Sequence, residues 1–273
     1  MVQKTRSIKF GRHQFRIRPT ADGWEGIIVG GGGTRFAADT EQVLISKLQD
    51  QVLMDTPEFV GFDGARTRFL NMFPGGFGDP KLVDGPKSEI GTKRDVVSRV
   101  AEMCPLEDAV SGRVAPASIF AAFKKSGMVD HRHMSGLKAA LEGPKGPRLI
   151  EIFARFATGE FDWACGEFGK RFHEDGLRTW PILTHMAFFW RPDQHAFMRP
   201  TAARAFARGV GHRLDMDYSS APEPNTYALY LDLLDQTRSH IADLEPRDYI
   251  DLQSFVWVVT KYPGHHAGIK DPI

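Results

Sequence analysis

Three polar residues interrupt a stretch near the C-terminus that is otherwise apolar. Residues 249–259 contain Asp251, Gln253 and Ser254 among aromatic and aliphatic side chains. A helix that is apolar nearly all round is buried, so each polar group in it needs a partner or a chemical role. One interpretation is a buried carboxylate, Asp251, facing an aromatic pocket. The alternative is a helix cap, with Asp248 as the N-cap and Asp251 in a capping-box-like turn.

Aromatic side chains gather in the segment 179–214. An apolar helix is predicted at 180–190, followed by the loop 191–195 and a second helix that begins at Pro200. The free N–H groups of that second helix, with Arg199 beside them, could hold an anion. The aromatic rings could stack on a nucleobase or could form an ordinary core. These rings belong to Trp180, Phe188, Phe189, Trp190 and Phe197.

Basic and apolar residues alternate in residues 7–18, which predicts a strand or hairpin with one basic face. The basic residues there, together with one on a later strand, are Lys9, Arg12, Arg16, Arg18 and Arg35. A small sheet backed by a helix is a layout of nucleic-acid-binding modules, so this face could contact phosphates. The alternative is a plain solvated surface. The run Gly30–Gly33 leads into Thr34-Arg35-Phe36 and not into a helix, which favours a hairpin turn over a phosphate loop.

Other chemistries have no sequence support. The close histidine pairs, His131 with His133 and His265 with His266, lack a nearby cysteine or carboxylate at a zinc-site spacing. The sequence also lacks a Gly-x-Ser-x-Gly elbow, a Walker motif, His-Glu-x-x-His and Cys-x-x-Cys. We therefore predict neither a metal nor another cofactor. Two cysteines cannot make a disulfide framework, and a reducing cytoplasm is the simplest compartment.

The elements that must position these residues are mainly helical. Residues 1–58 predict a small α+β module with a three-stranded sheet and one helix, which could contact DNA. Residues 59–92 are rich in glycine and proline and predict a connecting segment. Residues 93–273 predict a compact domain of many helices. Its expected helices are 93–103, 116–125, 132–142, 147–157, 161–174, 180–190, 200–210, 226–243 and 248–261.

Composition and charge are those of a folded soluble protein. The chain has 273 residues, 42% hydrophobic and 25% charged, with a formal net charge of +1. No apolar run approaches the roughly 20 residues of a membrane span. The charge is uneven: residues 1–38 carry seven basic and two acidic side chains, whereas residues 215–273 carry four basic and ten acidic ones. Such a chain could present a positive face without coating nucleic acid indiscriminately.

Two resemblances follow from these motifs. The rhythm from Pro181 to Leu214 resembles the helix-hairpin-helix DNA glycosylases, although Arg199-Pro200 stands where that family has a catalytic Asp and no Gly-x-Gly hairpin precedes it. Further blocks are similar to the Brig-type anti-phage DNA glycosylases, which remove glucosylated hydroxymethylcytosine from phage DNA and leave abasic sites. These blocks are Gly61–Arg66, Phe73–Phe77, Trp180–Thr184, Phe197–Pro200 and Pro246–Trp257.

The resemblance implies a monofunctional DNA glycosylase in anti-phage defence, whose partner is double-stranded DNA carrying modified bases. Such an enzyme needs a carboxylate near the sugar, donors near the departing base, a stacking pocket and a wedge for the gap. Our candidates are Asp251, then Asp193, as the carboxylate; Trp180, His185, Gln253 and Trp257 as the base pocket; and Arg16, Arg18, Arg66, Phe77 and Arg199 as DNA contacts, with Phe77 as the wedge.

A lyase with a Schiff-base lysine is less favoured, because no lysine falls in segments 179–214 or 246–258. The other hypotheses are a non-catalytic protein that binds DNA or a modified base, and a scaffold for protein interaction.

Overall fold

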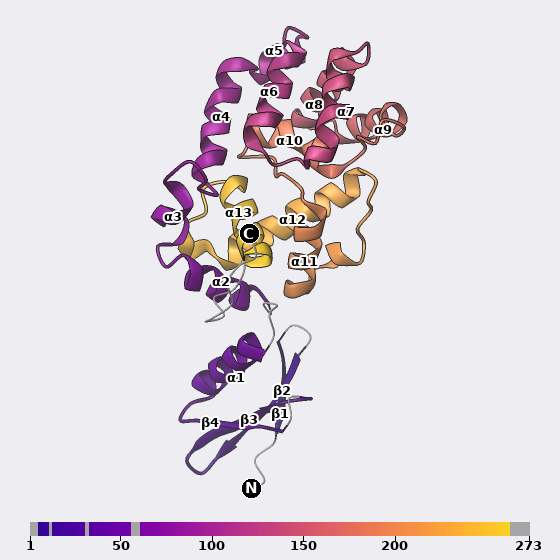
Figure 1. Cartoon of the computed structure of the whole chain (residues 1–273). Coiled ribbons are helices and arrows are strands. Elements are labelled where there is room, and N and C mark those ends of the chain that lie inside the picture. The colour runs from indigo at the N-terminus through magenta and orange to yellow at the C-terminus, as the bar shows by residue number, and fades with distance from the viewer. Residues whose placement is uncertain (1–4, 11–12, 31–32, 56–60, 263–273) are drawn as a thin grey trace.

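The computed structural model describes residues 5–10, 13–30, 33–55 and 61–262. The described chain is mainly helical, with one small antiparallel sheet at its N-terminal end (Figure 1). Its hydrophobic side chains form two separate cores, one within the N-terminal sheet and helix and one within the helices from Ala65 onward. The predicted fold class, mainly α with a small N-terminal α+β module, is therefore confirmed. None of the described helices is long and apolar enough to cross a bilayer.

The N-terminal sheet has four strands and not three, because the basic segment folds as a hairpin of two strands. The strands pair in sequence order and are β1 (Arg6–Phe10), β2 (His13–Thr20), β3 (Gly23–Ile28) and β4 (Arg35–Ala38). Helix α1 (Glu41–Asp55) covers one face, with Leu44 and Leu48 buried against Phe15 and Ile17. The glycine run joins β3 to β4, which are antiparallel, as the hairpin interpretation predicts.

The helical part follows proline, glycine and capping signals in the sequence. Proline occupies the first turn of six of its helices, and two of these six end at Gly127 and Gly211 in the left-handed conformation. The helices are α2 (Gly61–Met72), α3 (Pro80–Val83), α4 (Gly91–Met103), α5 (Leu106–Val110), α6 (Pro116–Ser126), α7 (His131–Glu142), α8 (Gly146–Ala157), α9 (Phe161–Arg171), α10 (Trp180–Trp190), α11 (Pro200–Val210), α12 (Pro224–His240) and α13 (Tyr249–Lys261). Short 3₁₀ turns lie at Gly76–Gly78, Arg213–Asp215 and Ala242–Leu244.

The helices pack in two groups. In one group α8 packs on α9 and α10, and α4 packs on α6 and α10. In the other, α13 packs on α2, α11 and α12 (Figure 1). The side chains of α4 and α13 meet where the two groups join, through Lys93 and Arg94.

The segment 59–92, predicted as a connector, is part of the helical core from residue 61 onward. Helix α2 begins at Gly61, and Phe69, Phe73 and Phe77 are all buried. The rings of Phe69 and Phe77 lie 5.0 Å apart, and Phe69 lies 5.0 Å from Phe255 of α13. The glycines and prolines here shape tight turns between packed elements and do not form a free linker.

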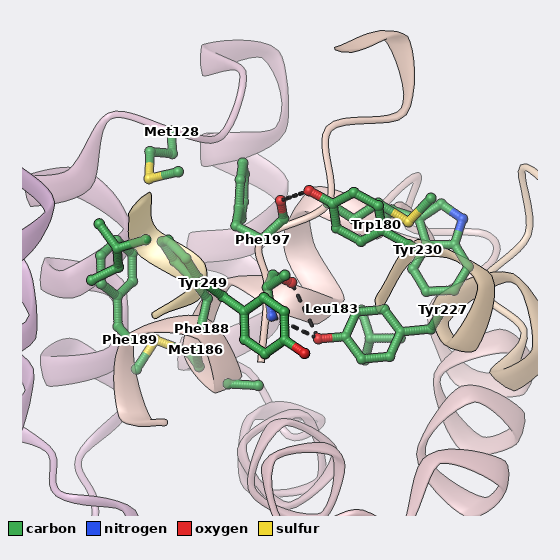
Figure 2. Packing of buried hydrophobic residues seen from close by; sticks show 14 of the residues in the cluster. Met128, Trp180, Leu183, Met186, Phe188, Phe189, Phe197, Tyr227, Tyr230 and Tyr249 are labelled. Atoms are coloured by element: carbon green, nitrogen blue, oxygen red, sulfur yellow. Dashed lines mark hydrogen bonds between the residues drawn. The ribbon is translucent and has the colours of Figure 1, made fainter. Parts of the chain in front are cut away.

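The aromatic residues of segment 179–214 form the centre of the second core (Figure 2). Trp180, Phe188, Phe189 and Phe197 are buried, and the hydroxyl of Tyr230 donates to the carbonyl oxygen of Phe197 at 3.0 Å. Of the two interpretations of these rings, the ordinary core is the one the packing supports.

Candidate functional site

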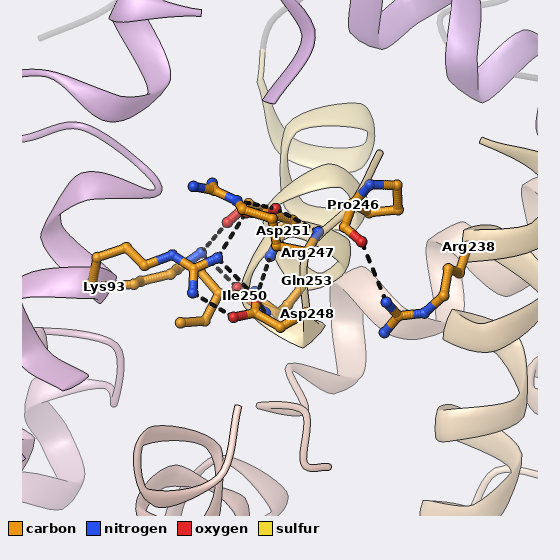
Figure 3. A network of polar contacts seen from close by, with 10 residues as sticks. Lys93, Arg238, Pro246, Arg247, Asp248, Ile250, Asp251 and Gln253 are labelled. Carbon is orange, nitrogen blue, oxygen red and sulfur yellow. Dashed lines mark hydrogen bonds and ion pairs between the residues drawn. The ribbon is translucent and has the colours of Figure 1, made fainter. Parts of the chain in front are cut away.

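A cluster of polar side chains lies between the first turn of α4 and the middle of α13 (Figure 3). The ammonium group of Lys93 donates to Gln253 Oε1 at 2.6 Å and to Ser254 Oγ at 2.7 Å. It also forms an ion pair with Glu89, one helical turn earlier in the chain. Lys93, Gln253 and Ser254 are buried, and the Glu89 side chain is 15% exposed. Two of the three polar residues that stood out in the sequence thus have a common partner, which comes from α4.

The third, Asp251, belongs to an arginine clamp beside this cluster. Its carboxylate is fully buried and accepts from Arg247 Nε at 2.8 Å, Arg247 Nη2 at 2.9 Å, the Arg247 backbone N–H at 3.0 Å and Arg94 Nη2 at 3.1 Å. Asp248 caps α13 by accepting from the N–H groups of Ile250 and Asp251, and it also pairs with Arg94. This is the capping interpretation of the sequence, reinforced by two guanidinium groups, of which Arg94 ties α13 to α4 and Arg247 bonds within the start of α13.

Arg199 and Trp257 form the outer side of the cluster. Trp257 lies one turn beyond Gln253 on α13, and the Arg199 guanidinium carbon sits 4.4 Å from the centre of its ring. Arg199 is the N-cap residue of α11 and donates to the Met128 carbonyl oxygen at 2.6 Å. Both side chains are partly exposed. The cluster therefore combines a carboxylate, an amine, an amide, a guanidinium group and an indole, drawn from three parts of the chain.

A close backbone contact fixes the start of α4, on which Lys93 depends. A Cβ atom at Gly91 would lie 2.1 Å from the Val83 carbonyl oxygen and 2.4 Å from Ser88 Oγ, so only glycine allows this approach. Ser88 in turn donates to the carbonyl oxygens of Gly85 and Val83. The turn that carries Glu89 is thus held against α3, and Lys93 projects from the first turn of α4 toward α13.

Burial sets the electrostatics of the site. Burial lowers the pKa of Lys93, Glu89 opposes that shift, and the positive charge of Arg199 adds to it. Burial also lowers the pKa of Arg199, against the influence of Glu89 and Asp130. Lys93 also lies at a helix N-terminus, where the helix dipole disfavours a positive charge. The charge on Lys93 is therefore less stable than that of a solvated lysine.

Two residues assigned to a base pocket lie within the core and have other partners than this cluster. Trp180 is 1% exposed, and its indole N–H donates to the Ser219 carbonyl oxygen at 3.0 Å. His185 is fully buried, stacks on Phe123 and lies 2.7 Å from Ser126 Oγ. Burial lowers the pKa of His185 to about 3, so it is a neutral core histidine near pH 7. The other two, Gln253 and Trp257, belong to the cluster.

The residues of the helical part that were predicted to contact or act on DNA lie in different environments. Phe77 packs between Phe69 and Phe255 and is 5% exposed, so it does not project from its turn as a wedge would. Arg66 is paired with Asp243 near the end of the second helix group. Asp193 is exposed on the loop before α11, and the neighbouring Pro192 accepts from the N–H of Tyr249 at the start of α13.

The sheet face that α1 leaves uncovered carries the predicted basic residues. Arg16 and Arg35 both pair with Ile27 in the strand register, so their side chains lie on the same face of the sheet. Arg18, two residues after Arg16, is on this face too and pairs with Glu25. Glu25 pairs with Arg18 and lies 3.6 Å from Arg35, so one carboxylate holds two guanidinium groups of this exposed surface. Lys9 is exposed on β1, and Arg12 lies outside the described residues.

Sequence reasoning did not find Lys93 and Glu89. Their spacing of four residues is that of an ordinary surface ion pair on a helix, which gave no sign of burial. The described residues hold no group of three or more histidine, cysteine or acidic side chains that could bind a metal, and His265 and His266 lie outside them. Comparison of the chain with known protein families, with curated proteins and with solved structures gave no match.

Proposed function

We propose that this protein is a DNA glycosylase that excises a modified base, such as a glucosylated hydroxymethylcytosine of phage DNA, and leaves an abasic site. The observation that carries the proposal is the cluster of Glu89, Lys93, Arg199, Gln253 and Trp257. It supplies the group types that cleavage of an N-glycosidic bond needs. These are a carboxylate for the cationic sugar, donors for the departing base and an aromatic face for stacking.

Within this proposal Glu89 is a better catalytic carboxylate than Asp251. Both oxygens of Asp251 accept bonds from arginines, and its side chain is fully buried. A carboxylate neutralised by two guanidinium groups has little charge left to stabilise an oxocarbenium-like sugar. Glu89 has one cationic hydrogen-bond partner, Lys93, among the contacts that the described structure gives it, and part of its side chain faces outward. Asp193, which is exposed, is the second candidate.

The N-terminal sheet supports DNA as the substrate. Arg16, Arg18 and Arg35 share one exposed face, and Glu25 holds two of them in place. Arginines held in this way suit phosphate oxygens, because the planar guanidinium group donates two parallel hydrogen bonds. In this proposal the sheet contacts the backbone and the helical part acts on the base.

The test uses DNA that carries glucosylated hydroxymethylcytosine and the same sequence with unmodified cytosine, followed by an abasic-site assay. We expect abasic sites in the modified DNA alone. Glu89→Gln should lower the rate by about 100-fold or more, the loss of a few kcal/mol of transition-state stabilisation. Glu102→Gln, at an exposed position on the same α4 helix, is the matched control and should keep the wild-type rate.

Three results would overturn parts of this proposal. Specific binding of modified DNA with no abasic sites would favour a non-catalytic reader of the modified base. Abasic sites produced at the wild-type rate by Glu89→Gln would remove Glu89 as the carboxylate and leave Asp193 as the candidate. Absence of any salt-dependent DNA binding would favour a protein-interaction scaffold.

A further inference from the structure

Lys93 and Arg94 are neighbours in the sequence, yet their partners differ in kind. Arg94 crosses to α13 and meets two carboxylates, Asp248 and Asp251, which is the usual pairing of a structural cation between helices. Lys93 crosses to the same helix but meets two neutral acceptors, Gln253 Oε1 and Ser254 Oγ. A lysine that served only to join two helices would be better paired as Arg94 is.

Burial lowers the pKa of Lys93, against the influence of the carboxylates Glu89 and Asp251. Lys93 is 6% exposed, it stands in the first turn of α4, and the charge of Arg199 opposes its own. Glu89, which forms an ion pair with it, is placed to accept a proton from the ammonium group. Gln253 and Ser254 can each reorient to donate to a neutral amine, because amide and hydroxyl groups are donors as well as acceptors. Buried lysines of this kind serve as Schiff-base nucleophiles.

We propose that Lys93 is the nucleophile of a DNA lyase activity that acts on an abasic deoxyribose. The inference rests on the proposed function for its substrate, DNA with a missing base. The least buried groups around the amine are Glu89, Arg199 and Trp257, so the sugar approaches from their side. This activity was disfavoured from the sequence because no lysine lies in the aromatic segments, but a lysine of α4 reaches α13 across 160 residues.

The chemistry balances without a cofactor. Lys93 transfers a proton to Glu89, and its free amine attacks the C1′ aldehyde of the ring-opened sugar. Loss of one water molecule, with the proton returned by Glu89, gives an imine cation between Nζ and C1′. The Glu89 carboxylate then removes a C2′ proton, the electron pair forms the C2′–C3′ double bond, and the C3′–O bond breaks with departure of the 3′ phosphate. Water hydrolyses the imine, which frees Lys93 and an unsaturated aldehyde at the strand end.

Borohydride trapping tests the inference independently of which base the protein removes. The probe is a duplex oligonucleotide with one preformed abasic site, incubated with the full-length protein and sodium borohydride. Hydride reduces the imine at C1′ to a stable amine, so a lyase becomes covalently joined to the DNA. We expect one predominant adduct, which peptide mass spectrometry places on Lys93. No adduct, or adducts only on exposed lysines or the N-terminus, would overturn the inference.

Variants supply the second measurement. Lys93→Arg keeps a cation with donors toward Gln253 and Ser254 but cannot form the imine, and it should lower trapping and strand cleavage at least 100-fold. Lys87→Arg, an exposed position in the turn before α4, should trap as the wild type does. If Lys93→Arg fails to fold, the mapping of the wild-type adduct still decides. Trapping on Lys93 without excision from modified DNA would keep this inference and reject the proposed base, whereas excision without trapping would do the reverse.

Discussion

The arginine clamp makes a quantitative prediction for Asp251→Asn. The substitution keeps the shape of the side chain but removes a buried negative charge that accepts four hydrogen bonds from Arg94 and Arg247. Breaking a buried ion pair costs about 3–5 kcal/mol. Here the two arginine side chains are 31% and 54% exposed and can turn partly to water. We therefore expect a loss of about 2–3 kcal/mol in the free energy of unfolding.

That loss corresponds to a fall in melting temperature of about 5–10 °C for a helical part of this size. The assay is thermal unfolding followed by circular dichroism, with abasic-site formation measured on the same preparation at a temperature where both proteins are folded. Asp95→Asn, at an exposed site on α4, is the control and should change the melting temperature by about 1 °C or less.

A double-mutant cycle with Arg94→Met isolates the clamp itself. We expect a coupling of about 1 kcal/mol or more between positions 94 and 251, because the two side chains are in direct contact. A melting temperature for Asp251→Asn within about 1 °C of wild type would refute the structural role of Asp251 in the clamp. A stable Asp251→Asn protein without glycosylase activity would return this residue to the catalytic role that the sequence suggested.

Three further predictions follow from burial and exposure. Phe77→Ala should destabilise the protein by about 3–5 kcal/mol in urea unfolding, because the ring packs on Phe69 and Phe255. An unchanged midpoint of the urea transition, with selective loss of activity on duplex DNA, would instead support a wedge. Burial lowers the pKa of His185 to about 3, so between pH 6.5 and 3 the unfolded chain takes up a proton that the folded chain does not, and the free energy of unfolding falls as the pH falls through this window. His185→Gln should flatten this pH dependence in urea titrations at several pH values. An unaltered pH dependence would contradict the prediction. Replacing Arg16 and Arg18 together by alanine should reduce the slope of log binding constant against log salt by up to about 2 with little change in melting temperature, and an unchanged slope would exclude phosphate contact by this face.

Local signals in the sequence predicted the helices well and their packing less well. Pro116, Pro181 and Pro200 lie in the first turns of three helices, whose starts were predicted correctly. The four-residue helix α3 and the five-residue helix α5 are too short to show a periodic apolar stripe, so neither was predicted. The hairpin at residues 6–20 was predicted as a strand or a hairpin, because alternation alone does not reveal a chain reversal.

Composition gave the wrong interpretation where one local pattern is compatible with two different structures. The turn residues of 59–92 indicated a linker, but glycine and proline also serve tight turns inside a core, and the aromatic residues between them decide which. Phe77 illustrates this, because a phenylalanine after Pro-Gly-Gly can project from a turn or fold back under it. Its contact with Phe255 depends on a helix 178 positions further along the chain, which no local pattern contains.

The same limit explains why Asp251 was the first candidate and Lys93 was not considered. A polar residue on a buried apolar helix needs a partner, but the sequence does not identify that partner. In the structure Arg247 and Arg94 together satisfy Asp251, and the pairing of Arg94 with Asp248 and Asp251 fixes the rotation of α13 against α4. With that rotation fixed, Gln253 and Ser254 face Lys93. Clamp variants therefore act on the site through stability and geometry, whereas Lys93→Arg acts on its chemistry, and a melting curve beside each rate separates the two effects.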